Sequence, residues 1–543
     1  MSEKGRSTDC IAGVAIARAA LLAAAAAALA LILVSGGSDA DPRTPPALPG
    51  LPPPFLGTAV SGDGGLTAAI DAYGDVVDLR APGPAGRALV DNPAARQVAG
   101  TVPEDTGIVP MVRVGPDGDP EPLWEGESVR QHYLHGTNVV ETVGFVQEAR
   151  LIVRTAVVGD SLAMTLIARS SRQGRALPAI SVDVEEGIDC AQAERAGVLE
   201  LLCRVGRALP PDLDADSREL SRECDRVVRD AGGAHRWVAL ARELGAGAPR
   251  WARAMYDRSL LVLHALTDRR SGAVAAGARD GWAYVWPRDA ATAALAYAAA
   301  GYRNEARRVA GFLSGLGSGV ERAARFDGAG APVPGRGPQG DAAGWIAVAS
   351  AAPPARPSAL DFLGAIATQR SNARNLPDYR EGSPGTYLGN AIADGVTAAR
   401  IAAEFETPRG LVREAGNPSS GLDSAAAWAV RPFASPSLYP AVRRTLLNLA
   451  GNATPYGITP GEGWAGGVDP WTAPTAWSAW SLAALGDRAA ALRLLADLRR
   501  AATPAGALPE RVDASTGVPR STTPLLWSHA FAILALRQLW PSP

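Results

Sequence analysis

The chain has 543 residues, 47% of them hydrophobic and 20% charged, which indicates a globular protein rather than a disordered one. This length suits about two to four domains. The formal net charge is −2 and the Lys and Arg residues are dispersed, which argues against a nucleic-acid partner and fits a neutral ligand. The four cysteines and five histidines show no metal-ligand spacing, so no metal site is expected.

Residues 1–40 are predicted to be a membrane anchor or a signal segment. Lys4 and Arg6 precede an apolar run that includes Ala19–Val34, and a spanning helix needs about 20 such residues. Positive charge on the N-terminal side predicts that this end lies inside and the rest outside. A cleaved signal peptide, with small residues near 38–40, is the alternative. Both interpretations place the folded part outside the cytoplasm.

A proline-rich stretch, DPRTPPALPGLPPP at 41–54, should form an extended linker, because proline lacks the backbone donor and fixes φ. From 55 to 207 the pattern is that of short strands, such as ARLIVRTAVV and SLAMTLIA, separated by Gly, Asp and Ser. Many short strands with turn signals predict a β-sandwich. Cys190 and Cys203 flank a predicted hairpin there, and they form either a disulfide or two buried thiols.

The second half is predicted to be helical. Residues 208–249 are charged and partly helical in pattern, which suits a connecting arm. From 250 to 543 apolar residues recur at helical spacing, as in TAWSAWSLAALGDRAAALRLLADLRR, and several runs end at glycine or proline. Helices of ordinary length joined by such loops indicate a bundle or a helical toroid.

Two segments of the helical half combine acids with aromatic rings. Residues 508–536 read LPERVDASTGVPRSTTPLLWSHAFAILAL, in which Pro509 stiffens a loop that carries Glu510. A lone glutamate in a loop is usually a solvated surface charge, but a fixed carboxylate can serve as a general base. His529, in the apolar helix that follows, is predicted to pack in the core.

The other segment, GWAYVWPRDA at 281–290, ends in Arg288 and Asp289. A guanidinium beside a carboxylate offers donors and acceptors to vicinal hydroxyls, and aromatic rings such as Trp286 stack on sugar faces. The alternative is that Asp289 only caps the helix that begins here.

Both segments resemble glycoside hydrolase family 15, the glucoamylase and glucodextranase family. The resemblance implies a multidomain chain in which a β-sandwich precedes an all-α (α/α)6 barrel. It implies that Glu510 is the general base of an inverting hydrolysis. The family's general acid follows a short Asp-aromatic pattern, which is similar here to PDYREG and assigns the acid to Glu381. Arg380 and Gly382 depart from that pattern, where the family has Trp and a second glutamate.

The resemblance also implies substrate contacts from Trp286, Arg288 and Asp289. Further matches are to Gln339 and Asp341 in GRGPQGDAAGW, to Trp471 in DPWTAPTAW, and to Trp527. The expected activity is an inverting, exo-acting hydrolysis that releases glucose from α-linked glucans or oligosaccharides, without a cofactor. A catalytically impaired carbohydrate-binding or sensing membrane protein is the alternative on the same fold. An inverting phosphorylase is a third interpretation, and a base at Glu510 argues against it.

Overall fold

The computed structural model describes residues 48–91, 107–115, 118–146, 148–170, 177–210, 213, 217–279, 281–351 and 387–542. All of them belong to one unit, Pro45–Pro543. The predicted anchor at 1–40 and most of the predicted linker lie outside the described residues. Within the described ranges, no helix is both long enough and apolar enough to span a bilayer.

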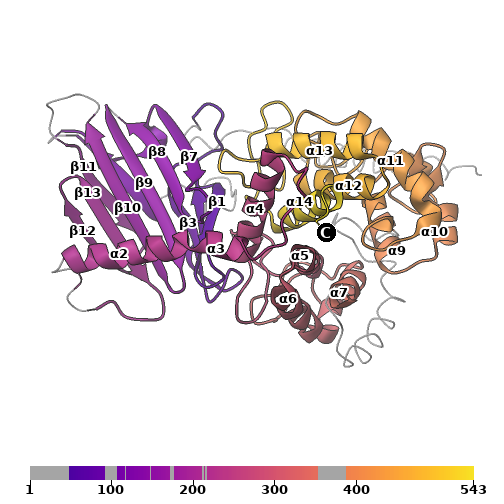
Figure 1. The fold of residues 1–543 in the computed structure, drawn as a ribbon, viewed down its shortest axis with the longest axis horizontal. Coiled ribbons are helices and arrows are strands. Elements are labelled where there is room, and N and C mark those ends of the chain that lie inside the picture. Colours follow the sequence, from indigo (N-terminus) through magenta and orange to yellow (C-terminus); the bar gives the residue numbers. More distant parts are fainter. Residues whose placement is uncertain are drawn as a thin grey trace, which may run out of the picture. The chain divides into compact units, whose positions relative to one another are not determined.

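Two antiparallel sheets form the first half of the described chain (Figure 1). One sheet contains, in order, β1 (Gly57–Gly62), β2 (Thr67–Asp71), β3 (Val76–Ala81), β5 (Ile108–Arg113) and β11 (Ala179–Val184), with β4 (Arg87–Asp91) on β3 and β6 (Glu121–Pro122) on β5. The other contains β12 (Asp189–Arg195), β13 (Val198–Arg204), β10 (Ser161–Ser170), β9 (Ala149–Val158), β8 (Val140–Val146) and β7 (Ser128–Tyr133).

The alternation of side chains along a strand explains how the second sheet buries both faces. In β10, Leu162 and Met164 point into the core between the sheets, while Ala163 points the other way. Helix α2 (Ser217–Gly232) packs on that outer face and runs across the strands in Figure 1, and its own residue Cys224 is buried against them. The predicted β-rich half is therefore a sandwich with a helix packed on one side.

The pairing of β12 with β13 decides whether Cys190 and Cys203 are free thiols or a disulfide. Cys190 and Cys203 stand directly opposite each other, with Cα atoms 4.0 Å apart, and form a disulfide. Cys224 is free and buried, and burial raises the pKa of its thiol to about 12. It is therefore a packing residue rather than a reactive one.

The second half is a two-layered ring of helices. Its inner elements each contact the next, and the last contacts the first: α5 (Pro287–Ala300), α7 (Ala342–Ala351), α9 (Leu388–Ala393), the 3₁₀ segment η6 (Ser424–Ala429), α12 (Thr472–Ala484) and α14 (Leu526–Leu539). The described outer helices are α4 (Arg250–Ala265), α6 (Arg303–Gly315), α10 (Ala398–Phe405), α11 (Tyr439–Gly451) and α13 (Arg488–Ala501). Inner helices are surrounded by protein, as in α12, where every residue from 472 to 482 is buried, the Thr and Ser residues included.

Short elements complete the chain. Helix α3 (Ala234–Val238) follows α2, and a small ribbon pairs β14 (Glu406–Thr407) with β15 (Gly410–Leu411). The other 3₁₀ turns among the described residues are η2 (Leu123–Glu125), η3 (Gly317–Glu321), η5 (Pro418–Ser420) and η7 (Pro436–Leu438).

Helix α4 joins the two halves. Its backbone carbonyls at Leu261 and Ala265 accept hydrogen bonds from Asn138 and Thr67 of the sandwich, at 3.3 and 3.2 Å. Both sandwich side chains are buried. Because buried polar groups are costly unless they are bonded, these contacts fix α4 against the sandwich.

Candidate active site

The N-terminal ends of four inner helices, α5, α7, α12 and α14, meet at one end of the ring. Arg288, in the first turn of α5, contacts Asp341 just before α7 and Trp527 at the start of α14. Thr472, the first residue of α12, hydrogen-bonds Ser528 of α14 at 2.7 Å. The loops that lead into these helices therefore converge, and they carry most of the residues that the sequence predicted for the site.

The loop that carries Glu510 is held from several sides. Its first residue, Leu508, donates its N–H to Nε2 of His529 at 2.9 Å and accepts from the N–H of Leu525 at 2.8 Å. The carbonyl of Pro509 accepts from the Thr472 hydroxyl. Burial lowers the pKa of His529 to about 3, so its imidazole is neutral and Nε2 can accept. His529 thus packs in the core, as predicted, and anchors the loop.

The side chain of Glu510 is half-buried and receives two neutral donors. Trp282 donates Nε1–H to Oε1 at 3.3 Å, and the hydroxyl of Ser521 donates to Oε2. Burial raises the pKa of Glu510, whereas these two hydrogen bonds and the charges of Arg511 and Arg279 lower it. The net shift is upward, towards the range in which a carboxylate accepts a proton readily.

A hairpin explains how Ser521 reaches Glu510. Val512 bridges Pro519 in antiparallel register, and the N–H of Glu510 donates to the carbonyl of Thr522 at 2.9 Å. The chain thus leaves Glu510, turns at 513–518 and returns beside it. We call residues 511–520 the base hairpin.

Arg288 is the centre of a buried polar cluster. Its Nη1 donates to Oε1 of Gln339 and to Oδ2 of Asp341, both at 2.9 Å. Its Nη2 lies 3.4 Å from Oδ2 of Asp289, and its guanidinium carbon is 4.7 Å from the centroid of the Trp527 ring. The structure therefore brings together five residues from three predicted segments of the sequence, and all five are buried.

Asp289 does not cap the helix. Trp286 occupies the N-cap position of α5, no side chain bonds the cap, and Asp289 is the third residue of the helix. Burial raises the pKa of Asp289 to about 7, Arg288 opposes the shift, and the charges of Asp341 and Glu510 add to it. The influence of Glu510 indicates that the two acids share one region.

The predicted tryptophans have different surroundings. Trp471 is the N-cap of α12 and packs edge-on against Trp464, with centroids 5.7 Å apart. The indole nitrogens of Trp471 and Trp527 are buried and have no hydrogen-bond partner within the described residues. Trp286 instead packs with Ala276 and Ala324, in a small cluster beside the Arg288 cluster.

The predicted acid, Glu381, lies outside the described residues. Within the described ranges, no group of three or more His, Cys, Asp or Glu side chains could hold a metal ion.

Three residues around Glu510 were not predicted for this position. The sequence did not single out Ser521 or Arg279, and it gave Trp282 no role at the base. The contact between Ser521 and Glu510 could not be predicted from the sequence, because it exists only through the fold of the base hairpin.

Comparison with known proteins identifies the fold. No family model matches the sequence, and no curated protein is similar to it. A crystal structure of a bacterial glucoamylase complexed with acarbose aligns over 89% of this chain and 94% of its own, with a TM-score of 0.67 and 14% identity. The chain has the fold of a bacterial glucoamylase. The resemblance to family 15 is thus shown at the level of the fold, sandwich and barrel together.

Two other solved structures align with about half of the chain. A glycosidase aligns over 54% of this chain and 99% of its own, with 21% identity and a TM-score of 0.46. The glucoamylase from Saccharomycopsis fibuligera aligns over 55% and 98%, with 14% identity and a TM-score of 0.45.

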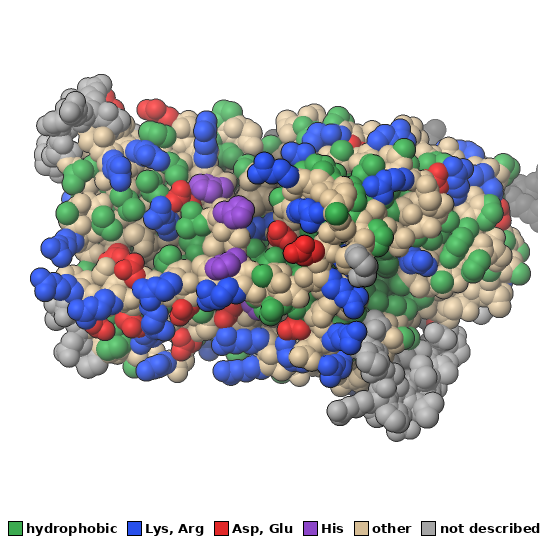
Figure 2. Space-filling view, viewed as in Figure 1, with side chains coloured by type: hydrophobic (Ala, Val, Ile, Leu, Met, Phe, Trp, Pro, Cys, Tyr) green, Lys and Arg blue, Asp and Glu red, His purple; other side chains and the backbone are tan. Residues whose placement is uncertain are grey.

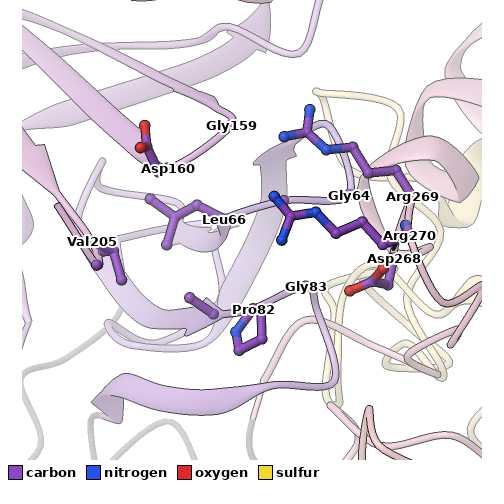
Figure 3. Close-up of a pocket in the computed structure, with 13 residues that line it drawn as sticks. Gly64, Leu66, Pro82, Gly83, Gly159, Asp160, Val205, Asp268, Arg269 and Arg270 are labelled. Atoms are coloured by element: carbon purple, nitrogen blue, oxygen red, sulfur yellow. Dashed lines mark hydrogen bonds between the residues drawn. The ribbon is translucent and has the colours of Figure 1, made fainter.

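The surface in Figure 2 carries mixed charge, and one cavity lies away from the candidate active site. On the face shown in Figure 2, basic and acidic side chains are interspersed, without a patch of one sign. A cavity of about 450 Å³ lies beside Arg269, Arg270 and Asp160 (Figure 3). None of the residues around Glu510 or Arg288 lines it, so it is not part of the candidate active site.

Proposed function

We propose that the chain is an inverting, exo-acting glycoside hydrolase that releases glucose from α-linked glucans or oligosaccharides. The observation that supports this most directly is Glu510, a half-buried carboxylate with two neutral donors at the end of the barrel where the Arg288 cluster lies. The fold shared with a bacterial glucoamylase supports the same reaction class.

In the proposed reaction, Glu510 removes a proton from water as the water attacks the anomeric carbon. The donors Trp282 and Ser521 orient the carboxylate, and its raised pKa makes it a stronger base than an exposed glutamate. A second carboxyl group must protonate the leaving oxygen from the opposite face, about 6.5–9.5 Å away. We assign that role to Glu381, which precedes the first residue of α9, Leu388, in the chain.

The Arg288 cluster is proposed to bind the terminal sugar. Arg288 holds Asp341 and Gln339, while Asp289 presents a carboxyl whose pKa of about 7 lets it donate or accept near neutrality. The indole N–H groups of Trp471 and Trp527 are buried donors that a sugar hydroxyl could satisfy. Aromatic walls and fixed polar groups together select a neutral, polyhydroxylated ligand.

We also propose that the folded part works outside the cytoplasm. The Cys190–Cys203 disulfide supports this, because disulfides persist in oxidising compartments. The predicted segment at 1–40 would direct the export.

The test is a panel of α-linked glucans and disaccharides with the full chain, read by glucose release and by NMR of the first anomer formed. We expect β-glucose first, which then mutarotates. α-Glucose as first product would contradict inversion, and binding without release would favour the sensing alternative. Glu381→Gln should affect substrates with good leaving groups least, because these need little protonation. An equal loss on all substrates would reject Glu381 as the acid.

A further inference from the structure

A groove lies at the junction of the sandwich and the barrel. It consists of two cavities of about 450 and 580 Å³, formed where β7 and the turn after it meet α4 and the segment that follows α13. The cavities share His132, Ala502, Thr503 and Pro504, so they adjoin. Each has the size of a small-ligand site, and neither is lined by Glu510 or by the Arg288 cluster.

One wall of the first cavity is an aromatic ring. Trp251, in the first turn of α4, lines this cavity and is partly exposed. Its ring stands edge-on to Trp540, with centroids 5.8 Å apart and an interplanar angle of 80°. The contact fixes the indole, and a fixed, partly exposed ring offers an apolar face to the C–H side of a sugar.

Polar side chains whose hydrogen-bonding groups face the cavity lie next to this ring. Asp257, His135 and Arg499 line it and make no hydrogen bond or ion pair closer than 4 Å with other described residues, although the charges of His135 and Arg258 act on Asp257. They combine a carboxylate acceptor with imidazole and guanidinium donors. Such a mixed set, next to an aromatic face, suits the hydroxyl groups of a neutral sugar better than an anion or a cation.

The floor of the cavity is rigid. Arg258 donates to Oδ1 of Asn138 at 3.0 Å and to the carbonyl of Thr137 at 2.8 Å, and its guanidinium carbon lies 3.5 Å from the centroid of the Tyr133 ring. Tyr133 in turn donates to the carbonyl of Val60 at 2.7 Å. A floor bonded to both halves of the molecule loses little freedom when a ligand binds.

The second cavity brings the groove to the base hairpin. It is lined by Thr516 to Pro519, which belong to the base hairpin. The same hairpin returns the chain to Ser521 beside Glu510. A ligand that spans both cavities therefore touches the loop that supports the proposed base.

We propose that this groove is a second binding site for an α-glucan chain, with Trp251 as its stacking platform and Asp257 as its main hydroxyl acceptor. The nature of the ligand rests on the proposed function. The groove binds interior units of a polymer and keeps it close to the site that removes terminal glucose.

The experiment is electrophoresis of the full chain through gels that contain soluble starch or dextran, in a Glu510→Gln background so that the polymer survives. We expect Trp251→Ala to weaken retardation about threefold to tenfold in at least one gel. Asp257→Asn should weaken it in the same gel, whereas Trp251→Phe, which keeps a ring, should retain most of it. Retardation that Trp251→Ala leaves equal to that of the Glu510→Gln parent, or no retardation of the parent in either gel, would overturn the second site.

Turnover of disaccharides by the same Trp251 and Asp257 variants, with Glu510 intact, separates the two proposals. Disaccharides are too short to use both sites, so their turnover should stay within about twofold of the unsubstituted chain. A larger loss with Trp251→Phe would assign the groove a structural role and overturn the proposal. Absence of turnover in every protein counts against the hydrolase alone, because the gels report on the groove independently.

Discussion

The environments of Glu510 and Asp289 differ although both acids lie at the same end of the barrel and burial raises the pKa of both. Glu510 is bonded by two neutral donors, an indole and a hydroxyl. Asp289 shares its surroundings with one guanidinium and a second carboxylate. Neutral donors fix a carboxylate without cancelling its charge, which suits proton exchange. A charged cluster suits binding, since it holds donors and acceptors in place.

Removal of the Glu510 carboxylate should have the largest effect. Glu510→Gln keeps the size and the Trp282 contact but cannot take a proton, so we expect kcat to fall by about 10²–10⁴-fold with substrate binding retained. Steady-state kinetics and titration with an unreactive analogue measure the two. Glu404→Gln, in an exposed pair on α10, is the matched control and should change neither. Near-normal kcat would remove Glu510 from the reaction.

Disruption of the Arg288 cluster should lower the stability of the folded chain. Arg288→Ala leaves Asp341 and Asp289 buried without their cation, and we expect the free energy of unfolding to fall by about 3–5 kcal/mol. Urea denaturation at pH 7 measures it. Arg443→Ala breaks an exposed pair with Asp487 and should leave the midpoint unchanged. Equal midpoints for both variants would show that the Arg288 cluster is not held by its charges.

The donors around Glu510 should control the pH profile. Ser521 lowers the pKa of Glu510, so Ser521→Ala should raise that pKa and move the acidic limb of kcat/KM to higher pH. Below this limb the loss should reach about tenfold, and it should shrink above it. Ser515→Ala, at the far end of the base hairpin, is the control. A loss that is equal at every pH would indicate a purely structural contact.

A buried acid pair in the sandwich gives the smallest expected effect. Burial, and then the charge of Asp71, raises the pKa of Asp75 well above its usual value. Stability from the protonated form is therefore present below the unfolded-state pKa and is lost as pH rises through the folded-state pKa. Asp75→Asn should raise the free energy of unfolding at pH 8 by about 1–2 kcal/mol, and by less near pH 4.

The control substitution should change the free energy of unfolding in the opposite direction. Asp78→Asn removes the partner of buried Arg80, 2.8 Å away, and should destabilise the chain at pH 8. Activity should stay unchanged in Asp75→Asn, which separates acids that serve the sandwich from acids that serve the site. A destabilised Asp75→Asn variant would show that the pair is ionised and bonded in the folded chain.

The sequence predicted the two halves because their patterns differ: larger apolar residues recur at every second position of β10, whereas α14 contains the continuous apolar run 530–536. Helical spacing alone left a bundle or a toroid open, and only the family resemblance implied a closed barrel, since the inner position at η6 is a six-residue 3₁₀ segment without a helical pattern. Arg288 and Gln339 were found as separate motifs, but their contact spans 51 residues. Ser521 was missed because only the base hairpin returns it to Glu510.

Every backbone polar group from Leu508 to Glu510 already has a partner inside the protein. The N–H and carbonyl of Glu510 pair with the carbonyl of Thr522 and the N–H of Thr472, at 2.9 and 3.1 Å, and the neighbours are bonded likewise. The proposed base therefore meets its substrate without first ordering a loop. Binding energy can therefore serve to distort the sugar ring instead of ordering the chain around Glu510. Because no movement of this loop is needed, turnover should depend little on solvent viscosity.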